Sequence, residues 1–209
     1  MTPPAPVILL FGGTFDPPHL GHTAICRTIA AEIGAHQVLC IPAALSPAKE
    51  ASPTPAHHRI AMLERALAND PLINVSTIEI DRGGRSYFVE TLHALRESVP
   101  DEAHLRFLIG ADHALGFHTW REPDTILTLA TPVIVARPPQ TPASLRAALL
   151  QQRNDATISP TCDPEWIVDA PLVDVSATEI RERLRTGERT DDLLDRDVAQ
   201  YIAEHALYS

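Results

Sequence analysis

The chain has 209 residues, of which 44% are hydrophobic and 21% charged, and these proportions are typical of a folded globular protein with a sizeable core. Its 17 basic and 27 acidic residues give a formal net charge of −10 at pH 7, which argues against general binding to nucleic acid or to an anionic membrane surface. An anionic ligand must therefore be attracted by a local group of cations and helix ends.

The cysteines and the start of the chain indicate the cellular compartment. Three cysteines are widely spaced and form no paired motif, so we expect reduced, mostly buried thiols at Cys26, Cys40 and Cys162. The first apolar run covers only residues 7–11, and no positive side chain precedes it, so it predicts neither a signal peptide nor a membrane span. We expect a cytoplasmic protein with a single domain over residues 1–209, helical from about residue 176 onward.

Residues 7–34 predict a strand, a glycine-rich turn and a helix. The continuous apolar run at residues 7–11 is typical of a buried parallel strand, and apolar residues at helical spacing follow Gly21 as far as Gly34. A helix N-terminus offers unpaired N–H groups and a positive dipole end, so the turn before it is suited to phosphate. Gly12 and Gly13 have no Cβ and let the backbone approach a ligand closely.

Two histidines stand at the start of this predicted helix. His19 and His22 are three residues apart and share one helix face, where imidazoles can donate to phosphate oxygens during phosphoryl or nucleotidyl transfer. They can also be surface residues, or metal ligands with Cys26, but no further ligand-spaced residues complete such a set. We therefore predict no metal site in the protein.

The whole string is more specific than its parts. Residues 12–22, Gly-Gly-Thr-Phe-Asp-Pro-Pro-His-Leu-Gly-His, match neither of the two common phosphate loops. They resemble the HxGH signature of the nucleotidyltransferase superfamily, in the form found in bacterial nicotinate-nucleotide adenylyltransferases. Two later segments resemble signatures of the same family in the same order, residues 107–112 and 176–181, so the resemblance spans nearly the whole chain.

After a short predicted strand at residues 37–41, a proline-rich loop carries one cation, Lys49. Such a loop lies where open α/β sheets bind ligands, although a loop lysine by itself is more often solvated. The resemblance implies a phosphate-binding role for Lys49, with Ala48 in place of the family's usual histidine. Residues 57–69 then predict a helix, in which Arg59 is expected to be mainly structural.

The middle of the chain predicts a strand at residues 73–80, a turn at residues 82–85 and a helix that opens at Ser86 with that serine as its N-cap. The resemblance implies that Ser86 and Tyr87 lie beside the nicotinate end of the substrate, and that Trp120 stacks near the same ring. Residues 105–110 predict a strand that runs into Asp112, which is either a helix cap or a ligand of a ribose hydroxyl. The resemblance to the family's GAD motif favours ribose.

The last third predicts a strand at residues 131–136, a helix at 140–154, short strands and loops at 155–175, and a helix at about 195–205. Ser176 and Glu179 form a potential capping box, while Thr178 and Arg181 share a face at a helix start and can hold phosphate. This stretch resembles the family's second signature, Ser-Ser-Thr-x-x-Arg, with Ala177 in place of the second serine.

Alternating strands and helices predict an α/β fold with a doubly wound, mostly parallel sheet. The resemblance implies a Rossmann-like nucleotidyltransferase that moves AMP from ATP to nicotinate mononucleotide, giving nicotinate adenine dinucleotide and pyrophosphate in NAD biosynthesis, with Mg²⁺ carried by the nucleotide. The implied catalytic residues are His19, His22 and Arg181. The implied ATP-binding residues are Gly12, Gly13, Thr14, Phe15, His19, His22, Asp112, Ser176, Thr178 and Arg181, and the implied substrate-binding residues are Lys49, Ser86, Tyr87 and Trp120.

Two other functions compete with this one. The first is another adenylyltransferase of the superfamily, acting on phosphopantetheine or FMN, against which the resemblance at Ser86, Tyr87 and Trp120 argues. The second is a nucleotide sensor without turnover, to which the departures at Ala48 and Ala177 lend some support. The sequence leaves open the choice between the acid and amide mononucleotides and the oligomeric state, a homo-oligomer included.

Overall fold

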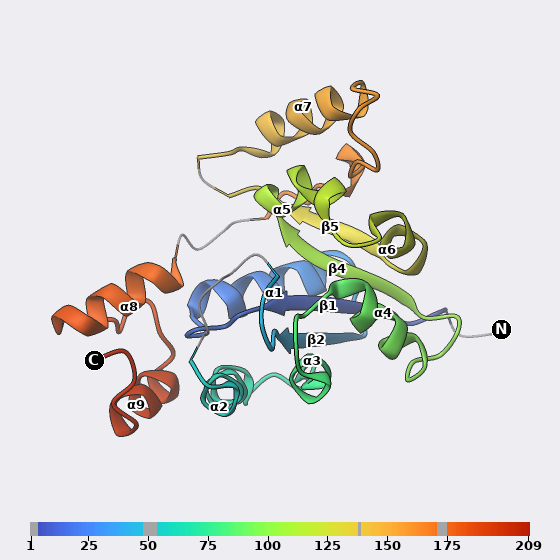
Figure 1. Ribbon diagram of the computed structural model, residues 1–209. Coiled ribbons are helices and arrows are strands. Elements are labelled where there is room, and N and C mark those ends of the chain that lie inside the picture. The colour runs from blue at the N-terminus through green and yellow to red at the C-terminus, as the bar shows by residue number, and fades with distance from the viewer. Residues whose placement is uncertain (1–3, 48–53, 138, 171–174) are drawn as a thin grey trace.

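The computed structural model describes residues 4–47, 54–137, 139–170 and 175–209 (Figure 1). A five-stranded sheet has the spatial order β3-β2-β1-β4-β5, and every neighbouring pair is parallel. The predicted doubly wound α/β fold is therefore confirmed, with a sheet that is parallel throughout. The strands are β1 Val7–Gly13, β2 Gln37–Pro42, β3 Ile73–Val75, β4 His104–Gly110 and β5 Thr131–Val135.

Helices connect the strands and continue after the last one (Figure 1). They are α1 Leu20–Glu32, α2 Ala56–Leu67, α3 Ile78–Arg82, α4 Phe88–Arg96, α5 Ala111–Leu115, α6 Pro123–Leu129, α7 Pro142–Arg153, α8 Ala177–Thr186 and α9 Arg196–Glu204, with 3-10 turns at Phe117–Thr119 and Pro164–Trp166. The helices predicted after residues 21, 57, 140 and 195 are confirmed to within two or three residues.

Both faces of the sheet are buried, which explains the continuous apolar run of β1. Leu9 and Phe11 enter one core and Ile8 and Leu10 the other, because successive side chains of a strand point to opposite faces. All four side chains are at most 7% exposed.

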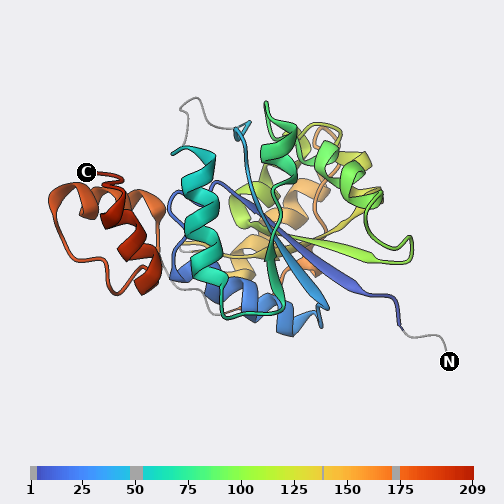
Figure 2. The same ribbon diagram turned by 90° about the horizontal axis from the view of Figure 1, so that it is seen from below.

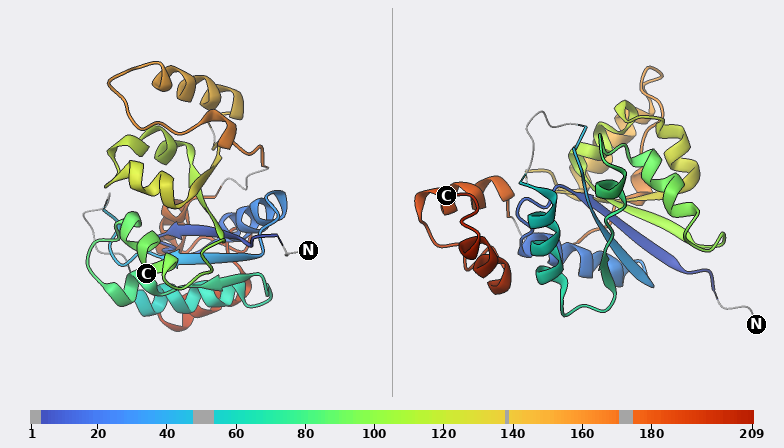
Figure 3. Two further views of the ribbon diagram at one scale, coloured as in Figure 1. Left: turned by 90° about the vertical axis from the view of Figure 1, so that its right-hand side faces the viewer. Right: turned by 60° about the horizontal axis from the view of Figure 1, so that its bottom comes forward.

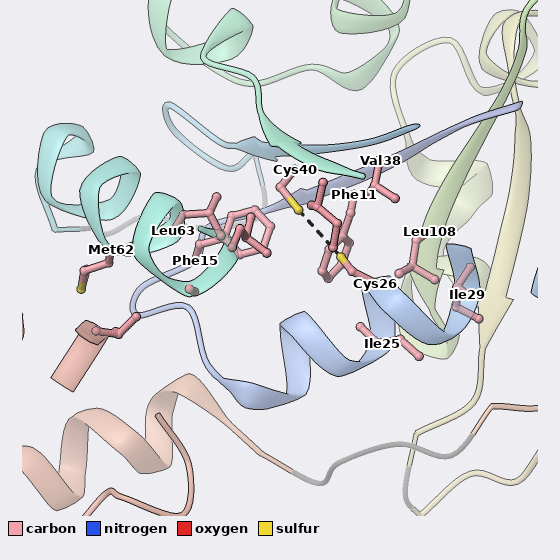
Figure 4. Packing of buried hydrophobic residues seen from close by; sticks show 14 of the residues in the cluster. Phe11, Phe15, Ile25, Cys26, Ile29, Val38, Cys40, Met62, Leu63 and Leu108 are labelled. Atoms are coloured by element: carbon pink, nitrogen blue, oxygen red, sulfur yellow. Dashed lines mark hydrogen bonds between the residues drawn. The ribbon is translucent and has the colours of Figure 1, made fainter. Parts of the chain in front are cut away.

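The first of these cores holds two of the three cysteines. Cys26 of α1 and Cys40 of β2 face each other with their sulfurs 3.8 Å apart, beside Phe11 and Leu63 (Figure 4). Cys162 is buried in the other core, and all three thiols are free, as expected.

The C-terminal segment, residues 175–209, stands to one side of the sheet, beyond the ends to which the strand arrows point (Figure 1). The view from below in Figure 2 and the right-hand view of Figure 3 show α8 and α9 in the same place. The segment is anchored by α9, whose Val198 and Ile202 are buried in the first core, and α9 packs against α2. Within the ranges described, no helix combines the length and apolar character needed to cross a membrane.

The strand predicted at residues 73–80 is wrong beyond Val75. β3 ends there, and α3 follows because Thr77 and Asp81 are joined twice, by backbone and side-chain hydrogen bonds of 2.8 and 2.7 Å. Glu79 is turned inward, where its carboxylate accepts a 2.7 Å bond from the Thr91 hydroxyl. These contacts outweigh the β-propensity of the isoleucines in this stretch.

Two further local predictions need correction. Ser176 does cap α8, accepting from the Thr178 N–H at 3.2 Å, but Glu179 pairs with Arg183 and does not complete a capping box. Of the stretch 155–175, the structure describes residues 155–170 and 175, and the expected short strands do not form in residues 155–170. A 3-10 turn and one isolated bridge, between Ile134 and Ile167, occur there instead.

Adjacent leucines of α7 test the core. Leu149 is 0% exposed and Leu150 is 46% exposed, so the same Leu→Ala change can be compared at a buried position and at its exposed neighbour. Leu149→Ala should lower the free energy of unfolding by about 2–5 kcal/mol, because it removes buried apolar area and leaves a cavity. Leu150→Ala should change it by less than about 0.5 kcal/mol. Urea unfolding measures both, and equal effects would contradict this placement of α7.

Candidate active site

The site lies where the carboxyl ends of β1 and β4 meet. These two strands lie side by side in the sheet, but the connections that leave them run to opposite sides. The chain passes from β1 to β2 on one side and from β4 to β5 on the other. Ligands of open α/β sheets bind at such a switch point. Residues 12–22, hereafter the signature segment, begin with the last two residues of β1 at this edge, and Gly110 ends the neighbouring strand β4.

The turn after β1 leaves room for a ligand on one side and is filled on the other. A Cβ on Gly12 would meet no heavy atom within 4 Å, whereas a Cβ on Gly13 would lie 3.0 Å from the Phe15 ring. Phe15 itself has φ of 50°, in the left-handed region, and its ring is 2% exposed. Because this side chain is buried, the backbone of Phe15 is the part that a nucleotide can meet.

His19 and His22 are brought together at the start of α1. Their rings stack with centroids 3.6 Å apart and planes at 22°, and the Phe15 ring packs edge-on against His22 at 5.1 Å. The backbone N–H of His19, the N-cap residue, donates to Nδ1 of His22 at 3.2 Å. A neutral His22 must then carry its proton on Nε2, which leaves that N–H as a donor.

Both imidazoles are neutral at pH 7. Burial, with a smaller effect of the Arg137 charge, lowers the pKa of His19 to about 4. Burial, followed by His19 and Arg137, holds the pKa of His22 well below its usual value. Nδ1 of His19 is buried and has no hydrogen-bond partner within the part of the chain that the structure describes. An unpaired buried polar atom is costly, so a ligand atom would be favoured there.

The metal alternative is not supported by this geometry. Cys26, which would complete a set with the two histidines, points into the core toward Cys40 (Figure 4). Across the described ranges, no three His, Cys, Asp or Glu side chains are grouped so as to hold a metal ion.

Arg137 is a site residue that the sequence analysis did not single out. Its exposed side chain follows β5 and lies against Gly110, because a Cβ there would be 3.8 Å from its Nε. Its charge lowers the pKa of both histidines, so the guanidinium lies near enough to act on them. The position directly after a buried strand, the signal used for Asp112, also applies to Arg137.

The second signature meets the signature segment from the C-terminal side. Arg181 of α8 donates from Nη1 to the backbone carbonyl of Asp16 at 2.6 Å and from Nη2 to the Thr178 hydroxyl at 3.2 Å. The backbone N–H of Leu20, at the first position of α1, donates to the carbonyl of Leu193 at 3.0 Å. Arg181 therefore contacts the signature segment and Thr178 lies beside Arg181, whereas the Ser176 hydroxyl caps α8.

Arg59 of α2 also holds the signature segment in place. It is 1% exposed, and its guanidinium donates to the backbone carbonyls of Thr54 and Thr14, both at 2.8 Å. Burial lowers the pKa of Arg59, although Asp16 opposes that effect. The expectation that Arg59 is mainly structural is confirmed.

Residues 43–45 join the signature segment to the predicted acceptor residues. The Ala43 N–H donates to the Gly13 carbonyl at 2.8 Å, and the Ala44 N–H donates to the Ser86 hydroxyl at 2.9 Å. The prediction of Ser86 as a helix N-cap is wrong, because α4 begins at Phe88 with Tyr87 as its N-cap. Through its hydroxyl, Ser86 instead links the loop after β2 to the residues that precede α4. Lys49 lies outside the described residues.

Tyr87 and Trp120 each contact a chain neighbour of the other, and their place beside a pyridine ring stays a prediction. The Arg121 guanidinium stacks 4.7 Å above the Tyr87 ring, and the half-buried Trp120 ring lies 5.9 Å from Phe88. Asp112 is exposed in the first turn of α5, whose N-cap is Gly110. The helix-cap alternative for Asp112 is therefore wrong, and its exposed side chain follows the carboxyl end of β4.

The depressed pKa of His19 predicts an acid-sensitive fold. As the pH falls, the unfolded chain takes up this proton near pH 6.5 and the folded chain only near pH 4. The contribution of His19 to the free energy of unfolding is complete above pH 6.5 and is lost toward pH 4, by about 3 kcal/mol. His19→Asn keeps a capping residue but removes this titration, so its unfolding free energy should depend less steeply on pH. Equal slopes in urea unfolding from pH 7 to 4 would contradict this account.

Comparisons with known proteins agree with this geometry. The family model described as cytidylyltransferase-like matches residues 10–183. Nicotinate-nucleotide adenylyltransferase of Salmonella typhimurium is 39% identical over 207 residues, which cover 95% of this chain and 97% of that protein. The probable nicotinate-nucleotide adenylyltransferase of Yersinia enterocolitica is 35% identical over 217 residues, covering 99% of this chain and 97% of the relative.

A solved structure shows the same fold at lower identity. Plasmodium falciparum nicotinic acid mononucleotide adenylyltransferase, complexed with NaAD, superposes with a TM-score of 0.75 at 19% identity, and 97% of each chain is covered. The likeness extends over the whole arrangement of sheet and helices. Taken with the sequence matches, it shows that the chain belongs to the nicotinate-nucleotide adenylyltransferases, within the cytidylyltransferase-like family.

Proposed function

We propose that the protein transfers the adenylyl group of MgATP to nicotinate mononucleotide, forming nicotinate adenine dinucleotide and pyrophosphate in NAD biosynthesis. The observation that carries this proposal is the stacked, neutral pair of His19 and His22 at the N-terminus of α1. Membership of the family at 39% identity over nearly the whole chain supports it.

The reaction needs no nucleophile from the protein. A phosphate oxygen of the mononucleotide attacks the α-phosphorus of ATP in line, and the bond from that phosphorus to the bridging oxygen breaks, so that pyrophosphate leaves with both electrons. Catalysis then consists of positioning and of stabilising the charge that moves onto the leaving pyrophosphate. The Nε2–H of His22, the positive dipole end of α1 and the guanidinium of Arg181 serve that purpose.

The remaining roles follow from position. Gly12, Gly13, Thr14 and the backbone of Phe15 cradle the triphosphate with the help of Ser176, Thr178 and Arg137. Asp112 accepts from the ATP ribose, Lys49 balances the acceptor phosphate, and Ser86, Tyr87 and Trp120 line the pyridine end. Mg²⁺ would arrive as part of the nucleotide substrate and would offset phosphate charge there.

The proposal also covers partners and location. The net charge of −10 favours small anionic substrates held at one local site over nucleic acid or a membrane surface. We place the enzyme in the cytoplasm, where its three thiols stay reduced. A homo-oligomer is compatible with this role.

An acceptor comparison tests the function. Incubation with MgATP should release pyrophosphate when nicotinate mononucleotide is present, and not with phosphopantetheine or FMN. Release with one of the other acceptors would assign a different adenylyltransferase. Binding of ATP without release in any mixture would favour a nucleotide sensor. Adding the amide mononucleotide to the series measures the preference between the two pyridine substrates.

His22→Ala tests the catalytic role directly. The change removes one donor to the transition state, so turnover should fall about a hundredfold or more while the protein stays folded. His93→Ala is the matched control, because His93 is an exposed histidine in the last turn of α4. Near wild-type turnover in His22→Ala, with an unchanged circular dichroism spectrum, would contradict the assignment.

A further inference from the structure

The end of the chain is bonded to the signature segment through Asp16. The Tyr208 hydroxyl donates to Oδ1 of Asp16 at 2.5 Å, although the two residues are 192 positions apart. The Thr54 N–H donates to the other carboxylate oxygen at 3.1 Å, and Arg181 holds the backbone carbonyl of Asp16. Both carboxylate oxygens and the carbonyl of one residue are therefore fixed from three separate parts of the chain.

The surroundings of Asp16 and Tyr208 determine the protonation states of both side chains. Burial alone would raise the pKa of Asp16, but the hydrogen bonds from Thr54 and Tyr208 and the charge of Arg181 outweigh it and lower the pKa. Burial and the bond to Asp16 raise the pKa of Tyr208. At neutral pH the carboxylate is therefore charged and the phenol keeps its proton, so Tyr208 is the donor in a charge-assisted bond.

The backbone near the C-terminus is held in an unfavourable conformation to make this contact. Ala206 and Tyr208 have φ of 48° and 66°, in the left-handed region that costs free energy for residues with a Cβ. The Leu207 N–H donates to the Ile202 carbonyl at 3.0 Å, which folds the last residues back over α9. Such a conformation persists where the surrounding contacts determine it, and the bond to Asp16 is one of these contacts.

We propose that Tyr208 is a positioning residue for ATP, which acts through Asp16 to fix the backbone that presents His19 and His22 to the triphosphate. Asp16 is three residues before His19, and its carbonyl is the acceptor that orients Arg181. Without the Tyr208 hydroxyl, a half-buried carboxylate loses a donor and is drawn toward water. That movement shifts the loop and frees Arg181. The inference rests on the proposed function for the identity of the ligand.

Tyr208→Phe tests the role with one hydroxyl removed. Loss of a hydrogen bond to a charged group that orders the ATP loop should weaken ATP binding and raise the KM for ATP by about tenfold. The KM for nicotinate mononucleotide should stay unchanged, because the network lies on the side of the histidines. A variant that was merely less stable would instead lose active enzyme and show a lower kcat with both KM values unchanged.

Tyr201→Phe is the matched control from the same C-terminal segment. Its hydroxyl is bonded to Nδ1 of His58 at 2.9 Å, between α9 and α2, and does not reach the signature segment. This change should leave both KM values at the wild-type level. An equal rise in the KM for ATP in the two tyrosine variants, or no rise in Tyr208→Phe, would overturn the proposal.

Asp16→Asn completes a double-mutant cycle. If Tyr208 acts through Asp16, the double variant should bind ATP no more weakly than the weaker single variant, whereas multiplied losses would overturn the proposal. Calorimetric titration with ATP alone separates this inference from the proposed function. If the wild type binds ATP but makes no dinucleotide, the function fails and the binding comparison still decides the role of Tyr208. If the wild type is active and Tyr208→Phe binds ATP equally well, only this inference fails.

Discussion

The structure depends on how one short loop, residues 14–20, is held in place. Its backbone carbonyls at Thr14 and Asp16 accept from the guanidinium groups of Arg59 and Arg181, and the N–H of Leu20 donates to a carbonyl of the C-terminal segment. The three partners come from α2, from α8 and from the chain before α9. A loop held by such distant elements takes this conformation only in the folded chain, so the candidate site and the tertiary structure form together.

The same packing sets the chemistry of the histidines. Because the Phe15 ring and the helix start enclose the pair, burial lowers both pKa values and keeps the rings uncharged. A neutral imidazole can donate to a phosphate oxygen and does not add a fixed charge that would bind the substrate and the product equally. The positive charge of the site comes instead from Arg137, which acts on the histidines, and from Arg181, which donates to the Asp16 carbonyl.

The sequence predicted those parts of the fold and site that depend on local pattern. Strands that are buried on both faces have continuous apolar runs in the sequence. The motif of residues 12–22 predicted a phosphate-binding loop there. Contacts between distant segments were not predictable in this way. The isoleucines at residues 78 and 80 predicted a strand. In the structure this stretch is helical, because Glu79 and Asp81 form hydrogen bonds that favour a helix. Arg137 follows a buried strand, as Asp112 does, but that position does not show that it acts on the histidines. Tyr208 belongs to no short motif, and only the packed structure brings it to Asp16.

The catalytic role of the loop requires that it presents His22 as a neutral donor with its proton on Nε2. The most direct measurement is a ¹⁵N–¹H correlation spectrum of the His22 ring, assigned by comparison with His22→Ala. At pH 7 we expect one protonated nitrogen, Nε2, and an unprotonated Nδ1 that accepts from the His19 backbone. A ring protonated on both nitrogens at pH 7, or a neutral ring with its proton on Nδ1, would contradict it.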